Sequence, residues 1–316
     1  MTTHTAYRLT TRTKAGTITG LVALALIALG FALPAFVSRS TIQDLFFILT
    51  MLALAQLWNL LAGYAGLVSV GQQAFVGIGA YAMFAAVILL GWNPVVAILA
   101  GGVAALLLAI PTAFFAFRLQ GAYFAIGTWV IAEVTRLLVA QWKALGGGTG
   151  PSLPREATGN IMGVDLVRAL FGVREAAARD ILAYWLALVL AVAITGGIYW
   201  LLRNRLGLAL AALRDNIDAA QSVGVDAVRL KWAVFMLAAA ATGLVGGLVF
   251  MQTARISPGA AFAVTDWTAY VIFIVVIGGI GTIEGPIVGV IVFFLLRSAL
   301  ADYGSWYLLT LGLIAI

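Results

Sequence analysis

Residue types that commonly catalyse reactions are scarce in this sequence, and none stands in a pattern that a catalytic site needs. The only histidine is His4, so the H-E-x-x-H zinc motif is missing. None of the three lysines follows a glycine, as a phosphate-binding Gly-Lys-Ser/Thr loop requires. Ser69 stands two residues before Gly71, but Leu67 occupies the position where a nucleophile elbow has glycine. We therefore predict no catalytic residue, no metal site and no enzyme activity on this chain.

One ion pair can form inside an apolar segment. Glu133 and Arg136 are three residues apart, so on a helix they share a face and can neutralise each other. An unpaired charge in the middle of a bilayer costs at least about 2.5–3.5 kcal/mol, which favours pairing or a polar cavity. Two interpretations stay open: a structural ion pair, or residues that line a path across the membrane.

The composition excludes a water-soluble protein. Of the 316 residues 63% are hydrophobic and only 9% are charged, and the mean hydropathy is +1.09. Soluble domains are about half apolar and a quarter charged, so these few charges predict a membrane protein. Cysteine is absent, which excludes disulfides and thiolate metal ligands. We attribute the formal net charge of +6 to basic residues on the cytoplasmic side of a membrane, not to nucleic-acid binding.

The apolar runs predict helices that span the membrane. A spanning helix takes about 20 residues and barrel strands alternate over about ten, so continuous runs predict an all-α polytopic membrane protein with about ten transmembrane helices. The runs cover residues 18–37, 42–62, 70–90, 94–117, 121–141, 181–202, 232–251, 267–280, 286–300 and 306–316. Because the last run is too short to cross a bilayer, we expect the natural chain to continue beyond residue 316.

The distribution of basic residues predicts the orientation. We expect residues 1–17 to be a cytoplasmic N-terminal tail and residues 18–316 to be one transmembrane domain, with an outer loop at 142–180 and a cytoplasmic loop at 203–231. The tail and short connections then hold nine Lys or Arg inside and two outside, as the positive-inside rule expects. The nine are Arg8, Arg12, Lys14, Arg118, Arg203, Arg205, Arg214, Arg229 and Lys231, and the two are Arg39 and Arg255.

The stretch from Asn59 to Tyr81 is poor material for an uninterrupted helix facing lipid. It holds five glycines within seventeen residues, with Ser69, Gln72 and Gln73 among them. Glycine inside a helix costs roughly 1 kcal/mol relative to alanine, and helices that break at membrane depth present free backbone groups to a cavity. The sequence predicts either a broken helix or a tightly packed glycine face.

Other glycines recur at intervals of four residues. Gly281, Gly285 and Gly289 form one such series, and Gly243 and Gly247 form another. Small residues at this spacing let helix backbones approach closely. We therefore predict close helix packing at both series.

The cytoplasmic loop contains a predicted amphipathic helix. From Leu206 to Val223 the apolar residues Leu210, Leu213, Ile217 and Ala220 fall at helical spacing, and Gly224 ends the helix. Such a helix can lie on the membrane surface or dock into a groove of a partner. Its apolar face is weak and it holds one basic residue, which favours docking.

These segments resemble the permease subunits of ATP-binding-cassette importers for branched-chain amino acids, and the M-type subunit more than the H-type. The stretch 59–81 is similar to the family signature N-L-L-x-G-Y-x-G-x-x-S-x-G-x-x-A-F-x-G-I-G-A-Y, with Gln72 where histidine is common. Residues 214–224 resemble the cytoplasmic coupling loop, with Asp218 in place of the usual Glu. Residues 277–289 resemble the late glycine-rich motif, and 147–150 and 256–258 also fit.

The resemblance implies a fold of about ten helices with broken helices and an inverted repeat, in the bacterial inner membrane. It also implies four partner chains: an H-type permease, two cytoplasmic ATP-binding subunits that hold ATP and Mg²⁺, and a periplasmic substrate-binding protein. No cofactor is implied on this chain. Coupling to the ATPases would fall to Arg214, Asp215, Asp218, Ala219, Ala220 and Gly224. The translocation path or its packing would involve Gly63, Gly66, Ser69, Gly71, Gln72, Gly77, Gly79, Gly281 and Gly285.

Three alternatives stay open. One is an importer of the same family that carries urea, amides or another small polar solute, because the sequence does not identify the solute. Another is an ion-coupled secondary transporter, which needs ionisable residues at mid-membrane, where Glu133 and Arg136 are the candidates. The third is a structural or channel-like membrane protein, in which transport would continue without nucleotide.

Overall fold

The computed structural model describes residues 14–300, and the regular structure of that range is almost entirely helical. Its helices are α1 (Lys14–Ala32), α2 (Arg39–Asn59), α3 (Gln72–Leu90), α4 (Pro94–Ala116), α5 (Ala122–Ala140), α6 (Arg155–Gly159), α7 (Val164–Phe171), α8 (Glu175–Arg203), α9 (Arg205–Asp215), α10 (Ile217–Ser222), α11 (Ala227–Thr253), α12 (Pro258–Ala261), α13 (Tyr270–Gly278) and α14 (Glu284–Leu300). Between residues 14 and 300 the only extended pairing is an isolated bridge from Ser152 to Arg255.

Seven segments in the described range are long and apolar enough to cross a membrane. They are Arg39–Tyr64, Gln72–Leu90, Pro94–Ala116, Ala122–Ala140, Glu175–Arg203, Ala227–Thr253 and Pro258–Gly278. The shorter α1 and α14 coincide with the first and ninth apolar runs, and the tenth run lies outside the described residues. The predicted class, an all-α polytopic membrane protein, is confirmed. The inverted repeat stays a prediction.

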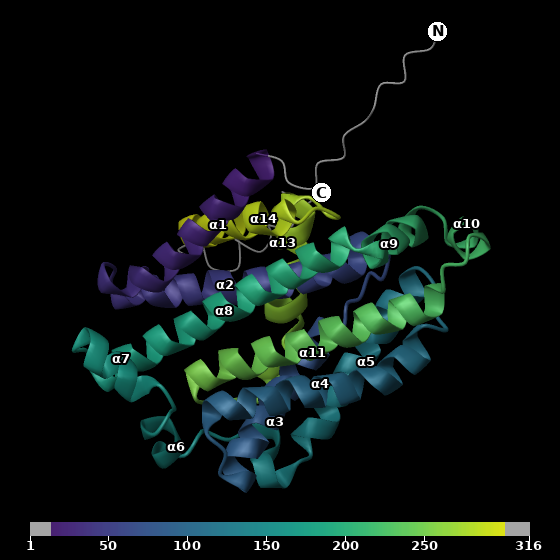
Figure 1. The fold of residues 1–316 in the computed structure, drawn as a ribbon. Helices are drawn as coiled ribbons and strands as arrows, with labels where there is room; N and C mark the ends of the chain where they lie inside the picture. Colours follow the sequence, from purple (N-terminus) through teal and green to yellow (C-terminus); the bar gives the residue numbers. More distant parts are fainter. Residues whose placement is uncertain (1–13, 301–316) are drawn as a thin grey trace.

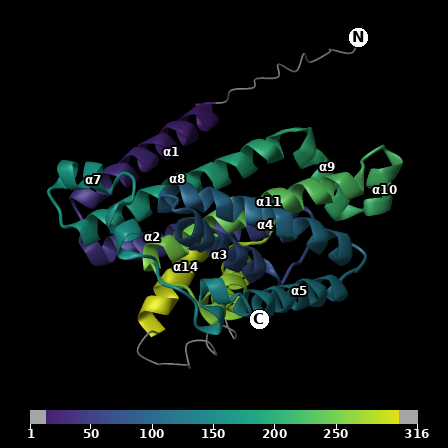
Figure 2. The same cartoon turned by 90° about the horizontal axis from the view of Figure 1, so that it is seen from below.

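The long helices run between two ends of the molecule (Figure 1). At one end, called here the α7 end, α6 and α7 precede the start of α8. At the other, the α9 end, α8 leads into α9 and α10 before α11 returns beside it. Figure 2 shows α1 at one side of the bundle and α5 at the other.

Helices extend into the predicted tail and into both predicted loops, whose membrane boundaries stay predictions. Lys14 already begins α1, so the predicted tail 1–17 enters the helix within its last four residues, and residues 1–13 lie outside the described range. The predicted loop 142–180 contains α6 and α7 and gives up its last residues to α8, which begins at Glu175. The predicted loop 203–231 ends where α11 begins at Ala227. Charged residues in the first or last turn belong to these helices, so apolar runs underestimate helix length.

Glycines bring α3, α4 and α11 together at the centre of the bundle. A Cβ built on Gly101 of α4 would lie 2.6 Å from the carbonyl oxygen of Gly79 in α3 and 3.0 Å from that of Gly243 in α11. No side chain fits at that distance, so backbone contacts backbone there. The predicted packing role of Gly243 is therefore confirmed, whereas a Cβ on Gly247 meets only ordinary contacts, the nearest at 3.4 Å.

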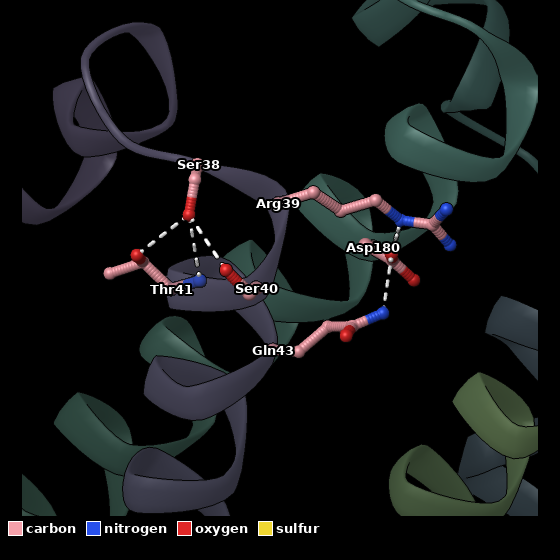
Figure 3. Close-up of polar contacts among 6 residues, drawn as sticks. All are labelled: Ser38, Arg39, Ser40, Thr41, Gln43 and Asp180. Carbon is pink, nitrogen blue, oxygen red and sulfur yellow. Dashed lines mark hydrogen bonds and ion pairs between the residues drawn. The ribbon is translucent and has the colours of Figure 1, made fainter.

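A polar clamp joins α2 to α8 at the α7 end (Figure 3). Ser38 caps α2 by accepting a hydrogen bond from the backbone N–H of Thr41 at 3.3 Å. Arg39 pairs with the buried carboxylate of Asp180, which also accepts a hydrogen bond from Gln43 at 3.0 Å. Because Asp180 is buried, these two donors replace the hydrogen bonds that its carboxylate would make to water.

We predict that Asp180→Ala destabilises the protein by about 1–3 kcal/mol, because Arg39 and Gln43 lose their acceptor. The matched control is Asp165→Ala, which removes an exposed pair with Arg168 at 3.7 Å and should change stability by no more than about 0.5 kcal/mol. Thermal unfolding of the two purified variants measures the difference. Equal unfolding temperatures for both variants would contradict a structural role for the clamp.

Candidate functional site

Two interruptions of the helices lie close together towards the α9 end. At the first, α2 ends in a π-helical turn, Leu60–Tyr64, and the chain continues without regular helix until α3 begins at Gln72. At the second, α13 ends at Gly278 and α14 begins at Glu284. The sequence left a broken helix and a packed glycine face as alternatives for 59–81, and the structure has the break.

Side chains of α2 bind the backbone of the second interruption. The Nδ2 of Asn59 donates to the carbonyl oxygen of Thr282 at 2.7 Å, and its Oδ1 accepts from the N–H of Gly281 at 2.8 Å. The Nε2 of Gln56 donates to the carbonyl oxygen of Ile283 at 2.8 Å. Asn59 and Gln56 are both fully buried. Backbone groups that leave a helix inside a membrane need such partners, because lipid offers none.

Gly63 allows the two interruptions to touch. A Cβ built on Gly63 would lie 2.6 Å from the backbone nitrogen of Gly281. Gly281 has a φ of +79°, in the left-handed region that favours glycine. Gly281 therefore lies in the turn between α13 and α14 and not on a helix. The predicted close packing at Gly281 is present, but it joins the turn to Gly63 and is not a contact between two helices.

Protein groups also bind the backbone of the first interruption. The indole N–H of Trp58 donates to the carbonyl oxygen of Ser69 at 2.8 Å. The N–H of Val70 donates to the hydroxyl of Thr128 at 3.0 Å, and the N–H of Gly71 donates to the hydroxyl of Ser69 at 3.2 Å. Ser69 and Gly71 therefore shape this segment, and the segment is held between α2 and α5.

Gln72 and Gln73 begin α3 in a buried setting. Gln72 donates to the carbonyl oxygen of Leu54 at 3.1 Å, and its own Oε1 has no partner among the described residues. Gln73 accepts a hydrogen bond from Thr268, so the start of α3 is tied to the segment that precedes α13.

The loop at the α9 end forms two helices. The predicted continuous helix 206–223 is wrong, because Asn216 adopts an extended conformation and caps α10 by accepting from the N–H of Ala219 at 3.0 Å. Leu210, Leu213 and Ala220 are buried within this chain, whereas the sequence analysis assigned their apolar face to the membrane surface or to a partner. Ile217 follows the break and is 43% exposed, although its spacing placed it on the same apolar face. The helical spacing of the apolar residues was visible in the sequence, but the cap at Asn216 that divides the helix was not.

Arg214 connects this loop to both interruptions. Its Nη1 donates to the carbonyl oxygen of Gly63 at 3.3 Å. The same Nη1 lies 3.1 Å from where a Cβ on Gly281 would stand. Its Nε lies 3.4 Å from the carboxylate of Asp215, the next residue in the chain. One guanidinium therefore contacts a loop residue and lies beside two glycines from distant parts of the sequence.

A cleft of about 820 Å³ lies beside the loop at the α9 end. Gly66 and Val68 of the first interruption line it on one side, Asp218 and Gln221 of α10 on another, and Ala125 of α5 on a third. A smaller cavity of about 340 Å³ is lined by Arg214, Asp215 and Gly66, among others. Both cavities lie between the loop and the first interruption.

The structure brings some predicted site residues together and leaves others apart. Gly63, Gly281 and Arg214 meet, and Gly66, Asp215 and Asp218 line the neighbouring cavities. Ala219 and Gly224 are exposed, whereas Ala220 is 2% exposed and packs inside the chain. The coupling role of Arg214, Asp215, Asp218, Ala219, Ala220 and Gly224 stays a prediction, as does the path role of Gly63, Gly66 and Gly281.

Three predicted path or packing glycines make close contacts. A Cβ on Gly77 would lie 2.5 Å from the ring of Phe262, one on Gly79 would meet the backbone of Gly243, and one on Gly285 would meet the carbonyl oxygen of Gly279. These contacts account for the three glycines by packing alone. Whether any of them borders a translocation path stays a prediction.

Glu133 and Arg136 pair on α5, away from the two interruptions. Arg136 Nε lies 2.9 and 3.1 Å from the two carboxylate oxygens of Glu133. Their side chains are 46% and 31% exposed. Residues 14–300 contain no group of three or more His, Asp or Glu side chains that could hold a metal ion.

The sequence analysis missed the residues that hold the site together. Asn59 and Gln56 were not among the predicted site residues, nor was the partner Thr268. A signal existed for Asn59, because it is the first residue of the family-like stretch 59–81. Burying an amide side chain costs free energy unless it forms hydrogen bonds. The Asn and Gln residues in the apolar α2 could therefore have been predicted as site residues from the sequence.

Comparison with known proteins identifies the family of this chain. A family model described as "Branched-chain amino acid transport system / permease component" matches residues 38–316. The chain belongs to this family. No solved structure matches the chain significantly.

Relatives within the branched-chain amino acid permease family are similar over most of the chain. The high-affinity branched-chain amino acid transport system permease protein LivM of Escherichia coli (strain K12) is 32% identical over 308 residues, which is 92% of this chain and 71% of the relative. The LivM protein of Salmonella typhimurium is 31% identical over 309 residues, with the same coverage. A probable LivM of Methanocaldococcus jannaschii is 27% identical over 119 residues, 38% of this chain and 34% of the relative.

We predict that Gly63→Ala destabilises the protein by about 1–3 kcal/mol, because its methyl group overlaps the backbone of Gly281. Gly196→Ala in α8 is the matched control: nothing lies within 4 Å of that position, so this variant should be as stable as the parent or slightly more stable. Thermal unfolding of both purified variants tests the contact. If Gly63→Ala unfolds no earlier than Gly196→Ala, the two interruptions do not touch as described.

Proposed function

We propose that this chain is the permease subunit of an ATP-binding-cassette importer that carries branched-chain amino acids across the bacterial inner membrane. The family match over residues 38–316 and the named relatives support the proposal. In this assignment the energy comes from other subunits, and the chain contributes a path and a way to open and close it.

The proposed complex contains this chain, an H-type permease, two cytoplasmic ATP-binding subunits and a periplasmic substrate-binding protein. ATP and Mg²⁺ bind to the ATP-binding subunits. The N-terminus and the α9 end lie in the cytoplasm, and the α7 end faces the periplasm. The distribution of arginine and lysine supports this orientation: Arg118, Arg203 and Arg205 lie in the connections at the α9 end.

The observation that carries the proposed mechanism is the contact of Arg214 with Gly63. When an ATP-binding subunit moves the loop formed by α9 and α10, Arg214 transmits the displacement to the carbonyl group of Gly63. Gly63 abuts Gly281, so the second interruption moves with the first. Interrupted helices in transporters allow one part of the bundle to rock against another around a central path.

Exposed residues near the loop offer a contact surface for an ATP-binding subunit. Ile217, Val223 and Val228 are large apolar side chains that are exposed at the α9 end. Asp218 and Gln221 border the cleft beside them. An apolar surface rimmed by polar groups is typical of a protein interface. Ala220 is buried within the chain and is therefore not part of this exposed surface.

Uptake by the purified complex in proteoliposomes tests the function. We expect leucine, isoleucine and valine to accumulate only when ATP and the binding protein are present, and we expect an ionophore to have no effect. Accumulation that an ionophore abolishes and ATP does not drive would indicate a secondary transporter. ATP-driven uptake of urea or an amide, without leucine uptake, would retain the mechanism and reject the solute, and uptake without nucleotide would indicate a channel.

We predict that Arg214→Ala lowers substrate-stimulated ATP hydrolysis by at least about fivefold, since a partly exposed hydrogen bond of this kind contributes about 1 kcal/mol. Assembly with the ATP-binding subunits should be retained, because the Nη1 of Arg214 is directed to the carbonyl oxygen of Gly63 and the apolar contact surface is formed by other residues, Ile217, Val223 and Val228. The matched control is Arg205→Ala, an exposed arginine at the start of α9. Equal stimulation in the two variants would refute the proposed route.

A further inference from the structure

The ion pair of α5 lies on the most exposed of the spanning segments in the described range. Glu133 is about 17 Å from Ala122 and about 11 Å from Ala140 at a rise of 1.5 Å per residue. Only 28% of the apolar window of α5 is buried, the lowest share among the seven spanning segments of the described range. Glu133 is therefore near the centre of a helix that this chain barely covers, and Arg136 lies about one turn closer to the Ala140 end.

Lipid is a poor environment for this surface. Charged residues at the middle of a spanning helix cost about 2.5–3.5 kcal/mol each on insertion scales. Mutual pairing lowers the cost, but the pair uses only Nε and Nη2 of Arg136, and Nη1 makes no hydrogen bond to any described residue. The remaining donor and the exposed carboxylate of Glu133 need a polar neighbour that a hydrocarbon chain cannot supply.

The outward face of α4 provides the contrast. Leu99, Val103, Leu107 and Ile110 are all exposed there, and no charged residue occurs between Pro94 and Ala116. That face has the character expected of a lipid contact. Both α4 and α5 therefore expose large apolar side chains, but only α5 also carries charged residues. Charged residues favour a protein neighbour over lipid.

The charged side of α5 is also continuous with the cleft. Ala125 lines the cleft at the α9 end, and Arg136 follows about three helical turns later, so both lie on the same side of α5. The exposed ring of Trp129 lies between them. A partly exposed strip of α5 thus leads from the cleft to the ion pair.

We propose that the α5 face around Val130, Glu133 and Val134 packs against the second permease subunit. This inference rests on the proposed function, which supplies the partner. Among the proposed partners only another membrane-spanning chain reaches this depth, because the ATP-binding subunits and the binding protein lie on either side of the bilayer. The partner presents a polar group to Nη1 of Arg136, and the strip beside Trp129 borders the gap between the two permeases.

Site-specific photo-cross-linking in the assembled complex tests this surface. Benzoylphenylalanine replaces Val130 or Val134 on α5, and the matched controls replace Val103 or Leu99 on α4. The members of each pair have similar exposure: 50% for Val130 against 57% for Val103, and 49% for Val134 against 62% for Leu99. The complex is reconstituted in vesicles of phosphatidylethanolamine and phosphatidylglycerol, and the products are identified by mass spectrometry.

We expect both α5 positions to cross-link to the second permease and both α4 positions to give only lipid adducts. Lipid adducts alone at Val130 and Val134, in a complex that retains ATP-driven uptake, would overturn the surface and leave the proposed function standing. A cross-link to a second copy of this chain would overturn the choice of partner. A chain that copurifies with no second permease would overturn both the surface and the proposed function.

Discussion

The structure depends on backbone groups that leave a helix inside a buried, apolar bundle and still need hydrogen-bond partners. Asn59 satisfies this need for the second interruption by donating to Thr282 and accepting from Gly281. A free N–H or C=O in hydrocarbon costs several kcal/mol, so the interruption is stable only where a polar side chain reaches it. That side chain belongs to α2, which is itself interrupted five residues later. The two interruptions are therefore interdependent.

The same constraint also requires glycine where the two interruptions touch. An interruption is compact only if its backbone touches the neighbouring backbone, and the approach of Gly63 to Gly281 leaves no room for a methyl group. The same close approach lets Arg214 lie beside both. Since the loop of α9 and α10 contacts the interruptions through one guanidinium, a small displacement of the loop has a direct route into the membrane. This geometry is the physical basis of the proposed coupling.

Hydropathy predicted the fold class, because composition and the length of the apolar runs decide it. The glycine-rich stretch 59–81 was also identified from the sequence, and a broken helix was one of the two interpretations given for it. Side-chain to backbone contacts between distant segments could not be predicted, because the bond from Asn59 to Thr282 joins residues 223 positions apart. The sequence also did not show that a helix cap would compete with a continuous helix. Asn216 separates α9 from α10 at a point where the helical spacing of apolar residues continues. The period placed Ile217 on the buried face for the same reason.

The proposed transmission from loop to interruption is most directly tested by a distance measurement between spin labels on Ile280, beside the second interruption, and Leu107, on the outward face of α4. Since the chain has no cysteine of its own, the labels that this chain carries are confined to the two introduced cysteines. The account predicts that nucleotide binding to the assembled complex shifts the distance distribution and that Arg214→Ala abolishes the shift. An unchanged distribution in the parent, or an equal shift in the variant, would contradict it.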